Sequence, residues 1–393
     1  MSSQNTFRWL SVVGARPQFI KLATVCRAID KHNSQSRLRI EHLIVHTGQH
    51  YDADMTDTFF EQLKIPQPGW NLAVHSGSFA SQLGTMLQRL EPVIAAQTPS
   101  WVLVYGDTNS TLAGALVAAR LTIPLAHIEA GCRSYRAGMP EEQNRLVSDH
   151  LSRLLLAPSQ RAVENLRQEG IGTTNDPFSR HVVWVGDTML DALLTITGVC
   201  AEKAESTLQA LGLKKGQFYL LTMHRAENTD APDTLARVLN ALRTTTLPVV
   251  FPIHPRTRKL LPSISALRSS SSVRIIPPVS YMEMLILESQ ARAILTDSGG
   301  VQKEALYAQV PCLTLREETE WPETVDAGAN RLVGTSRDRI LAAIHDPFPS
   351  LRDAPKPFGN GHSGENIVRE ILAASAGIVP FTNAPILCTS AVS

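Results

Sequence analysis

Two acidic residues each close an apolar run, and one helix-like segment separates the two runs. Asp107 ends the run WVLVYGD and Glu129 ends the run IPLAHIE. Residues just past neighbouring parallel strands face the same opening of an α/β sheet. We therefore expect the two carboxylates at one cleft, where acids suit general acid–base chemistry. Asp107 has a second interpretation as a helix N-cap, because DTNST precedes an apolar helix-like segment.

A further pair of acids, Glu141 and Glu142, follows a proline in the segment MPEEQNR. Proline followed by acids is typical of the first turn of a helix, where the helix dipole favours negative charge. This explanation accounts for one acid of the pair more readily than for both. The segment is therefore a second candidate source of acid–base groups.

Cationic side chains follow other predicted strand ends. Arg16 and Lys21 lie in GARPQFIK after the first apolar run, and His224 and Arg225 lie in MHRAEN after a later one. Arg16 could instead form a surface ion pair, and His224 could be an ordinary hydrogen-bonded polar residue. Their shared position at strand ends favours binding of a phosphate.

The segment LTDSGGVQKEA predicts a helix that begins beside a run of glycines. Free backbone N–H groups and the helix dipole at Ser298, Gly299 and Gly300 suit an anion. Glu304, one turn further on, would reach ribose hydroxyls. The combination predicts a site for a nucleoside diphosphate.

Composition limits the class of protein. The chain has 393 residues, of which 43% are hydrophobic and 19% are charged, and its net charge is +1. This length favours two domains, and the charge balance gives no reason to expect a nucleic-acid partner. The five cysteines form no C-x-x-C pair, which favours reduced thiols and predicts no metal site. The N-terminus lacks a signal-peptide pattern and no apolar run is long enough to span a bilayer, so we expect a cytoplasmic protein.

Apolar runs without polar alternation alternate with helical patterns along most of the chain, and the series restarts after about residue 190. This pattern predicts an α/β fold of two Rossmann-like doubly wound domains, with a ligand in the cleft between them. The expected division is a first domain at 1–185, a second at 186–362, a helix at 363–377 and a tail at 378–393. GNGHSG at 359–364 matches G-x-G-x-x-G, but no strand precedes it. We therefore interpret it as a hinge loop rather than a dinucleotide site.

Several segments together resemble one known family, the non-hydrolysing UDP-N-acetylglucosamine 2-epimerases. The resemblance runs from about residue 8 to about residue 370, and its motifs occur in the family's order: GARPQFIK, HTGQHYD, YGDTNST, HIEAG, MPEEQNR, MHRAEN, HPRT, LTDSGGVQKEA and TEW. The resemblance implies a glycosyltransferase-B-like fold whose last helix packs back on the first domain. It also implies interconversion of UDP-GlcNAc and UDP-ManNAc without metal or other cofactor, in a protein that is commonly a homodimer.

Residue roles follow from the same resemblance. It implies that Asp107, Glu129 and Glu141 form the acid–base set and that His224, Arg16 and Lys21 steady the leaving diphosphate. It assigns UDP binding to Ser298, Gly299, Gly300 and Glu304, and a second, activating nucleotide-sugar site to Gln49 and His50. Because several carboxylates share one cleft, we expect their pKa values to be raised.

Two positions depart from the family pattern. Trp321 replaces an arginine in TEWPE, and Met284 stands where an aromatic residue often lies under uracil. The TEW segment is also found in epimerases of UDP-2,3-diacetamido-2,3-dideoxy-glucuronate, which makes that compound an alternative substrate. Its extra carboxylate would need a cation, for which Arg133, Arg136 and Arg316 are candidates. A hydrolysing epimerase or a glycosyltransferase on the same fold is a further alternative.

Overall fold

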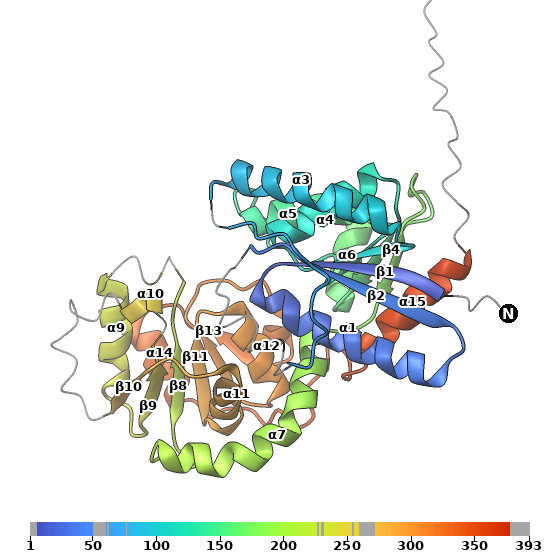
Figure 1. Cartoon of the computed structure of the whole chain (residues 1–393). Helices are drawn as coiled ribbons and strands as arrows, with labels where there is room; N and C mark the ends of the chain where they lie inside the picture. The colour runs from blue at the N-terminus through green and yellow to red at the C-terminus, as the bar shows by residue number, and fades with distance from the viewer. Residues whose placement is uncertain are drawn as a thin grey trace, which may run out of the picture.

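The structure is a computed structural model that describes residues 6–49, 60, 63–75, 77–225, 228, 232–253, 255–258 and 272–377. Within these residues two parallel sheets form two units, the N-terminal unit and the C-terminal unit, with helix α7 between them (Figure 1). This arrangement confirms the predicted α/β fold class. The division into domains near residues 185 and 362 stays a prediction, and the predicted tail at 378–393 lies outside the described residues.

The sheet of the N-terminal unit has the strand order β3-β2-β1-β4-β5-β6-β7. Its strands are β1 (Thr6–Val13), β2 (Arg39–His46), β3 (Trp70–Asn71), β4 (Trp101–Tyr105), β5 (Leu125–Ile128), β6 (Leu154–Ala157) and β7 (His181–Trp184). The helices of this unit are α1 (Arg16–Gln35), α3 (Phe79–Gln97), α4 (Asn109–Arg120), α5 (Pro140–Leu151) and α6 (Gln160–Gln168).

The sheet of the C-terminal unit has the order β10-β9-β8-β11-β12-β13. Its strands are β8 (Tyr219–Thr222), β9 (Val249–Pro252), β10 (Val273–Ile276), β11 (Ala293–Thr296), β12 (Cys312–Thr314) and β13 (Asn330–Leu332). The remaining helices are α7 (Thr188–Ala210), α9 (Pro232–Leu242), α10 (Pro255–Arg258), α11 (Tyr281–Gln290), α12 (Gly299–Tyr307), α13 (Pro322–Asp326), α14 (Arg337–His345) and α15 (Ser363–Gly377).

The strand β4 explains why the apolar runs lack polar alternation. All five of its residues are buried, because each face of the sheet is covered. Trp101, Leu103 and Tyr105 pack into the core cluster that includes α1 and α15, whereas Val102 and Val104 pack into the cluster that includes α3 and α4. The carboxyl end of β4 is thereby fixed between two cores.

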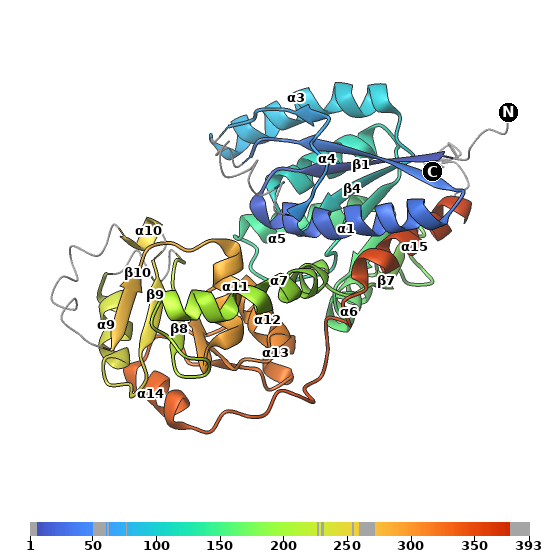
Figure 2. The same cartoon turned by 60° about the horizontal axis from the view of Figure 1, so that its bottom comes forward.

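Two chain crossings connect the units, and they lie against each other. The backbone N–H of Asp187, just after the first crossing, donates to the carbonyl of Phe358 at 2.9 Å. Beyond the second crossing, the backbone N–H groups of Ser363 and Gly364 donate to the buried carboxylate of Asp191 at 3.1 and 2.9 Å. Figure 2 shows the chain returning from α14 to α15, which lies beside α1. No strand precedes GNGHSG, in agreement with its interpretation as a loop at the crossing.

Candidate active site

The pairing of β4 with β5 brings Asp107 and Glu129 to one edge of the sheet. Tyr105 is the register partner of Ile128, and the backbone N–H of Gly106 donates to the Ile128 carbonyl at 2.9 Å. Asp107 follows Gly106, Glu129 directly follows Ile128, and the charge of Asp107 acts on Glu129. The expected convergence of these two acids at one opening is therefore present.

Asp107 is not the N-cap of the helix that follows it. That role belongs to Thr108, whose hydroxyl accepts the backbone N–H of Thr111. The Asp107 side chain is about one-third exposed and accepts a hydrogen bond from Arg145 Nε at 3.1 Å. The capping interpretation of Asp107 is thus wrong, and its carboxylate pairs with Arg145 of α5 instead.

Glu129 lies between two lysines, one from each unit. Its Oε1 accepts a hydrogen bond from Lys21 Nζ of α1 at 2.7 Å, and its Oε2 is 3.7 Å from Lys303 Nζ of α12. Its backbone φ of 72° is left-handed, an unfavourable conformation for a residue with a side chain that is typical of functional positions. A Cβ at Gly106 would lie 2.9 Å from Lys21 Nζ, so this lysine needs the glycine beside it.

The electrostatic prediction for Glu129 is wrong. Burial alone raises the pKa of this carboxyl, but the ammonium groups of Lys21 and Lys303 outweigh burial and hold the pKa below its ordinary value. We had expected neighbouring carboxylates to raise it. The nearer charges are cations, and an ion pair at about 3 to 4 Å in a buried site favours the charged form.

Glu141 and Glu142 have different environments although they are adjacent. Glu141 is exposed on the first turn of α5, whereas Glu142 is buried and accepts backbone N–H bonds from Ser134 and Tyr135, each at 2.9 Å. Arg145 pairs with Glu142 at 2.6 Å and with Asp107. Glu142 thus fixes the loop that follows Glu129, and Glu141 is the acid of the pair that is free to face solvent.

In the C-terminal unit, buried Asp297 organises the loop that carries His224. Its two carboxylate oxygens accept the backbone N–H of His224, each at 3.1 Å, and one of them accepts the N–H of Arg225 at 3.0 Å. Asn228 Nδ2 adds another bond to the same carboxylate. The imidazole of His224 is about 39% exposed and projects from a fixed backbone.

The segment Ser298, Gly299 and Gly300 begins α12, as predicted. Ser298 is the N-cap residue and makes no side-chain capping bond, which leaves the first turn of backbone N–H groups without that partner. Gly299 is buried, and a Cβ there would lie 3.1 Å from Trp321 Nε1. A helix start of this kind suits a phosphate.

Glu304 is buried on the next turn of α12. Tyr281 donates its hydroxyl to Glu304 Oε1 at 3.2 Å, and burial raises the pKa of Glu304 to about 6 against the opposing effects of Tyr281 and Lys303. The charge of Arg16, exposed at the start of α1, acts on Tyr281. The predicted residues of the two units thus approach across the groove.

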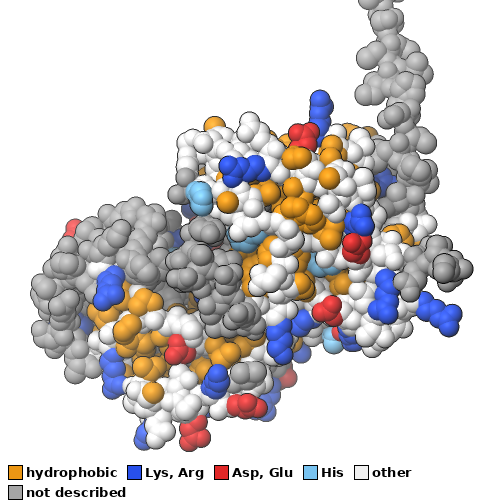
Figure 3. Space-filling model, in the orientation of Figure 1, with side chains coloured by type: hydrophobic (Ala, Val, Ile, Leu, Met, Phe, Trp, Pro, Cys, Tyr) orange, Lys and Arg blue, Asp and Glu red, His pale blue; other side chains and the backbone are white. Residues whose placement is uncertain are grey.

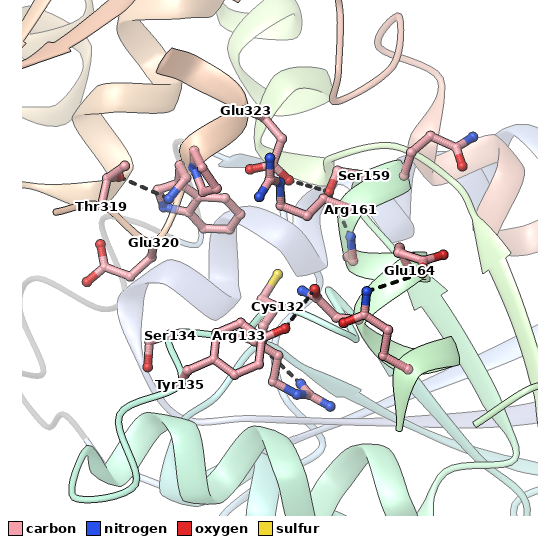
Figure 4. A pocket seen from close by; sticks show the side chains of 16 residues that line it. Cys132, Arg133, Ser134, Tyr135, Ser159, Arg161, Glu164, Thr319, Glu320 and Glu323 are labelled. Carbon is pink, nitrogen blue, oxygen red and sulfur yellow. Dashed lines mark hydrogen bonds between the residues drawn. The ribbon is translucent and has the colours of Figure 1, made fainter. Parts of the chain in front are cut away.

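A hollow of about 650 Å³ lies between the loop after β5 and the segment before α13. Its walls come from both units: Cys132 to Tyr135 and the start of α6 on one side, and Thr319 to Glu323 on the other. Figure 4 shows Ser159 against Glu323 across the units, where the serine hydroxyl donates to Glu323 Oε1 at 2.6 Å. Asp107, Glu129 and Glu141 are not among the residues that line the hollow, and Cys132 is the lining residue on which the charge of Glu129 acts.

The three arginines considered for an extra substrate carboxylate, and Gln49 of the predicted second nucleotide-sugar site, all contact other residues of the protein. Arg133 is buried against Asp149 and Glu169, Arg136 pairs with Glu318, and Arg316 pairs with Glu320. Each candidate cation for an extra substrate carboxylate therefore already has an acidic partner. The Gln49 side-chain oxygen accepts bonds from the N–H and the hydroxyl of Ser110, and His50 lies outside the described residues.

The two positions that depart from the family pattern both have protein neighbours. Met284 packs, partly buried, in a core cluster of the C-terminal unit. The ring of Trp321 lies under Lys303 Nζ, 3.9 Å from the ring centroid. Trp321, which replaces the family's arginine, therefore packs against the ammonium group of Lys303.

Charges of both signs are interspersed on the face shown in Figure 3. Among the described residues, no helix is long and apolar enough to cross a membrane. Within the same residues, no group of three or more His, Cys, Asp and Glu side chains is placed to hold a metal ion.

Comparison with known proteins connects this geometry to one family. The sequence model of the family described as UDP-N-acetylglucosamine 2-epimerase matches residues 32–372. The chain belongs to this family. The UDP-2,3-diacetamido-2,3-dideoxy-D-glucuronate 2-epimerase of Pseudomonas aeruginosa is 44% identical over 362 residues, which cover 91% of this chain and 97% of that protein.

The solved structures agree with this membership of the epimerase family. The crystal structure of the Methanocaldococcus jannaschii UDP-GlcNAc 2-epimerase, in complex with UDP-GlcNAc and UDP, matches with a TM-score of 0.81 at 41% identity, covering 93% of this chain and all of that one. UGT2 of Phytolacca americana, complexed with UDP-2fluoro-glucose and pterostilbene, matches with a TM-score of 0.60 at 10% identity, covering 94% of this chain and all of that one. That likeness concerns the fold alone, and it agrees with the expected glycosyltransferase-B-like architecture.

Sequence reasoning missed three charged residues that contact the candidate site residues or one another. They are Lys303, Asp187 and Asp297, which are buried. A clue existed for Asp297, because it directly precedes SGG at the end of a predicted strand. Lys303 lies in the interior of α12, where no local pattern distinguishes it from an exposed lysine.

Proposed function

We propose that the protein is a non-hydrolysing epimerase that interconverts UDP-GlcNAc and UDP-ManNAc at C2 of the sugar. The observation that carries this proposal is the position of Asp107 and Glu129 at adjacent strand ends of one unit, with Lys303 of the Ser298–Glu304 segment of the other unit 3.7 Å from Glu129. Acids on one side of a groove and an anion site on the other suit a reaction that moves a proton while a phosphate group departs. Membership of the 2-epimerase family supports the same reaction.

The proposed chemistry has two half-reactions. In the first, a carboxylate takes the C2 proton, the C2–H electron pair forms the C1=C2 double bond, and the C1–O electron pair leaves with UDP. The intermediate is 2-acetamidoglucal. In the second, a proton reaches the opposite face of C2, and a UDP oxygen bonds again to C1. The C2 proton is not next to a carbonyl, so it becomes removable only as the C1–O bond breaks. The net reaction involves no electron acceptor, and we expect no requirement for an added cofactor or metal.

We assign the roles on the two sides of the groove. The acid–base groups are Asp107, Glu129 and Glu141, and the groups that neutralise the departing diphosphate are Arg16, Lys21 and His224. UDP binds at Ser298, Gly299, Gly300 and Glu304. A rigid backbone supports His224, because buried Asp297 holds its N–H. Lys21 has a second role, since it already pairs with Glu129.

The test is proton NMR of the product formed in deuterated water. Epimerisation predicts solvent deuterium at C2 in an intact nucleotide sugar. Release of free sugar would instead indicate a hydrolysing epimerase, and transfer to an added acceptor would indicate a glycosyltransferase. Absence of exchange at C2 with either UDP-sugar would contradict the proposal.

The name of one relative makes UDP-2,3-diacetamido-2,3-dideoxy-glucuronate an alternative substrate. The Pseudomonas aeruginosa relative, at 44% identity, is named for UDP-2,3-diacetamido-2,3-dideoxy-D-glucuronate. The ion pairs of Arg133, Arg136 and Arg316 argue for the neutral sugar, because a C6 carboxylate would compete with their acidic partners. A panel of UDP-GlcNAc, UDP-ManNAc and the diacetamido uronate distinguishes the two substrates by kcat/KM.

We further propose a cytoplasmic homodimer that supplies a precursor for cell-surface polysaccharide such as O-antigen. Light scattering coupled to gel filtration tests the dimer, and fractionation of the source cells tests the location. Binding of a second UDP-GlcNAc near Gln49 and His50 would appear as a sigmoidal dependence of the initial rate of UDP-ManNAc formation on the concentration of UDP-GlcNAc.

A further inference from the structure

Lys303 is the charged side chain of the C-terminal unit that reaches Glu129. It is almost fully buried on α12, and its Nζ donates to Asp187 Oδ2 at 2.6 Å. The same ammonium lies 3.9 Å from the ring centroid of Trp321 and 3.7 Å from Glu129 Oε2. Asp187 and Trp321 therefore hold the ammonium in place beside Glu129, at a distance too long for a hydrogen bond.

The two carboxylate oxygens of Glu129 therefore have different hydrogen-bonding surroundings. Oε1 is occupied, because it accepts a hydrogen bond from Lys21. Oε2 is buried and has no hydrogen-bond partner among the described residues. A buried carboxylate oxygen without a partner is costly unless a nearby charge stabilises it. Lys303 supplies that charge and leaves the oxygen free.

We propose that Lys303 is a positioning residue for the reaction, which keeps Glu129 ionised with one oxygen free to take a proton. This inference rests on the proposed function, in which Glu129 is an acid–base group. Lys303 comes from the opposite unit, so the favourable field at Glu129 depends on the approach of the two units seen here. Glu129 is therefore held in the ionised form, which is able to accept a proton, when the two units lie as close together as they do here.

Other ionisable groups lie near the Glu129 carboxylate and also affect its titration. They are Lys21 on α1, Asp107 after β4, Cys132 in the loop after β5, and Tyr307 on α12. Asp187 and Glu304 face Lys303 as well. Burial raises the pKa of Cys132 and of Tyr307, so both remain neutral in the working range of pH. Lys303 and Lys21 are the cations that oppose the burial of Glu129.

The experiment measures the Glu129 carboxyl directly, by carbon NMR of protein labelled at the glutamate side-chain carboxyl carbon. The resonance of Glu129 is the one that Glu129→Gln removes. In Lys303→Met this resonance is expected to titrate at a pH at least about one unit higher than in the unsubstituted protein, because an opposite charge at this range shifts a carboxyl by about one to three units. Lys303→Arg should restore most of the difference.

Lys31→Met is the matched control. Lys31 carries the same charge in an exposed pair with Glu365 and does not contact Glu129. It should leave the Glu129 titration unchanged. An unchanged Glu129 titration in folded Lys303→Met would overturn the proposal.

Removing Lys303 alone leaves Asp187 buried without its cation, which could prevent folding. The double variant Lys303→Met with Asp187→Asn removes both charges, and the same rise of the Glu129 titration is expected there. With active enzyme, the acidic limb of kcat/KM should move upward by a similar interval, which a merely structural role would not produce. Failure of the proposed function would appear separately, as no turnover of either UDP-sugar by the unsubstituted protein, while the NMR measurement remains decisive for Lys303.

Discussion

Asp297 holds His224 mainly by its backbone: both carboxylate oxygens lie 3.1 Å from the backbone nitrogen of His224, whereas Nδ1 of the imidazole is 3.7 Å from Oδ1. The residue that organises the loop is therefore distinct from His224, the residue proposed to contact the diphosphate. Substitutions at the two positions should have different consequences.

Asp297→Ala should lower both stability and activity. The substitution leaves the N–H groups of His224 and Arg225 without their buried acceptor, which costs about 1–3 kcal/mol in free energy of unfolding. Urea denaturation measures this loss. His224→Ala should lower turnover while changing the free energy of unfolding by no more than about 0.5 kcal/mol, because the imidazole is partly exposed. Equal stability of the two variants would contradict this division of roles.

Asp107→Asn and Glu129→Gln should separate binding from turnover. Both acids lie on the unit opposite the predicted nucleotide site, so calorimetry should find UDP binding retained. Since one positioned acid or base contributes roughly 10²–10⁴-fold, kcat should fall by that factor in each variant. Full activity in both variants would remove these acids from the mechanism.

Glu141→Gln and Glu142→Gln form a matched pair of neighbouring substitutions. Glu142 is buried and fixes the loop at Ser134 and Tyr135, so its amide variant should lose about 1–3 kcal/mol in free energy of unfolding. Glu141 is exposed, so its variant should keep its stability within about 0.5 kcal/mol and lose turnover. Thermal denaturation and initial rates measure the two effects. The reverse pattern would make Glu142 the acid–base residue.

Because Glu288 and Glu304 are buried carboxyls with raised pKa values, we expect the free energy of unfolding to fall as the pH rises. Glu288 is fully buried on α11, and neither oxygen has a hydrogen-bond partner among the described residues. Burial, with the charge of Glu304, raises the pKa of Glu288 well above its ordinary value, and the pKa of Glu304 is about 6. A carboxyl whose pKa is raised by folding contributes stability that is fully present below about pH 4.3 and is lost as the pH rises through its folded pKa.

Denaturation between pH 5 and 7 measures this contribution. Each such carboxyl lowers the free energy of unfolding by up to about 1.4 kcal/mol per pH unit. Glu288→Gln should make the decline less steep than in the unsubstituted protein. The same slope in both proteins would mean that Glu288 is ionised in the folded state.

Substitution of Gly364 tests how closely α15 packs on α1, and substitution of Gly198 in α7 is its control. A Cβ at Gly364 would lie 2.8 Å from the carbonyl oxygen of Thr24, so Gly364→Ala should lower the free energy of unfolding by about 1–3 kcal/mol. Gly198, within α7, has no neighbour within 4 Å of such a Cβ. Gly198→Ala should therefore raise it by about 0.5–1 kcal/mol, as alanine favours a helix. Calorimetric unfolding distinguishes the two, and a stabilising Gly364→Ala would disprove the close packing.

The sequence predicted those parts of the site that depend on strand ends. Apolar runs such as 101–105 are recognisable without tertiary information, and parallel pairing brings their carboxyl ends to one edge. Asp107 and Glu129 converge for this reason. The start of α12 was predictable on similar grounds, because a strand and a serine precede the two glycines with which the helix begins.

The rest depended on contacts between residues far apart in the chain. Which of Glu141 and Glu142 is buried depends on how α5 rotates against the sheet, and a single helical turn does not determine that. The pairing of Lys303 with Glu129 joins residues from two sheets, and it reversed the pKa direction expected for Glu129. Arg133 was a candidate for binding substrate until Asp149 and Glu169 proved to surround it.

The contact between Asp187 and Phe358 ties together the two segments by which the chain passes between the units, and such a tie suits a pivot between them. In a swivel about that point, atoms move in proportion to their distance from it. The bond from Lys303 to Asp187 would hardly lengthen, whereas groups at the distant end of the groove would travel furthest. A nucleotide sugar would then enter from the side away from this pivot while the pair of Lys303 and Asp187 stayed intact, and the field at Glu129 would still depend on how closely the two units approach.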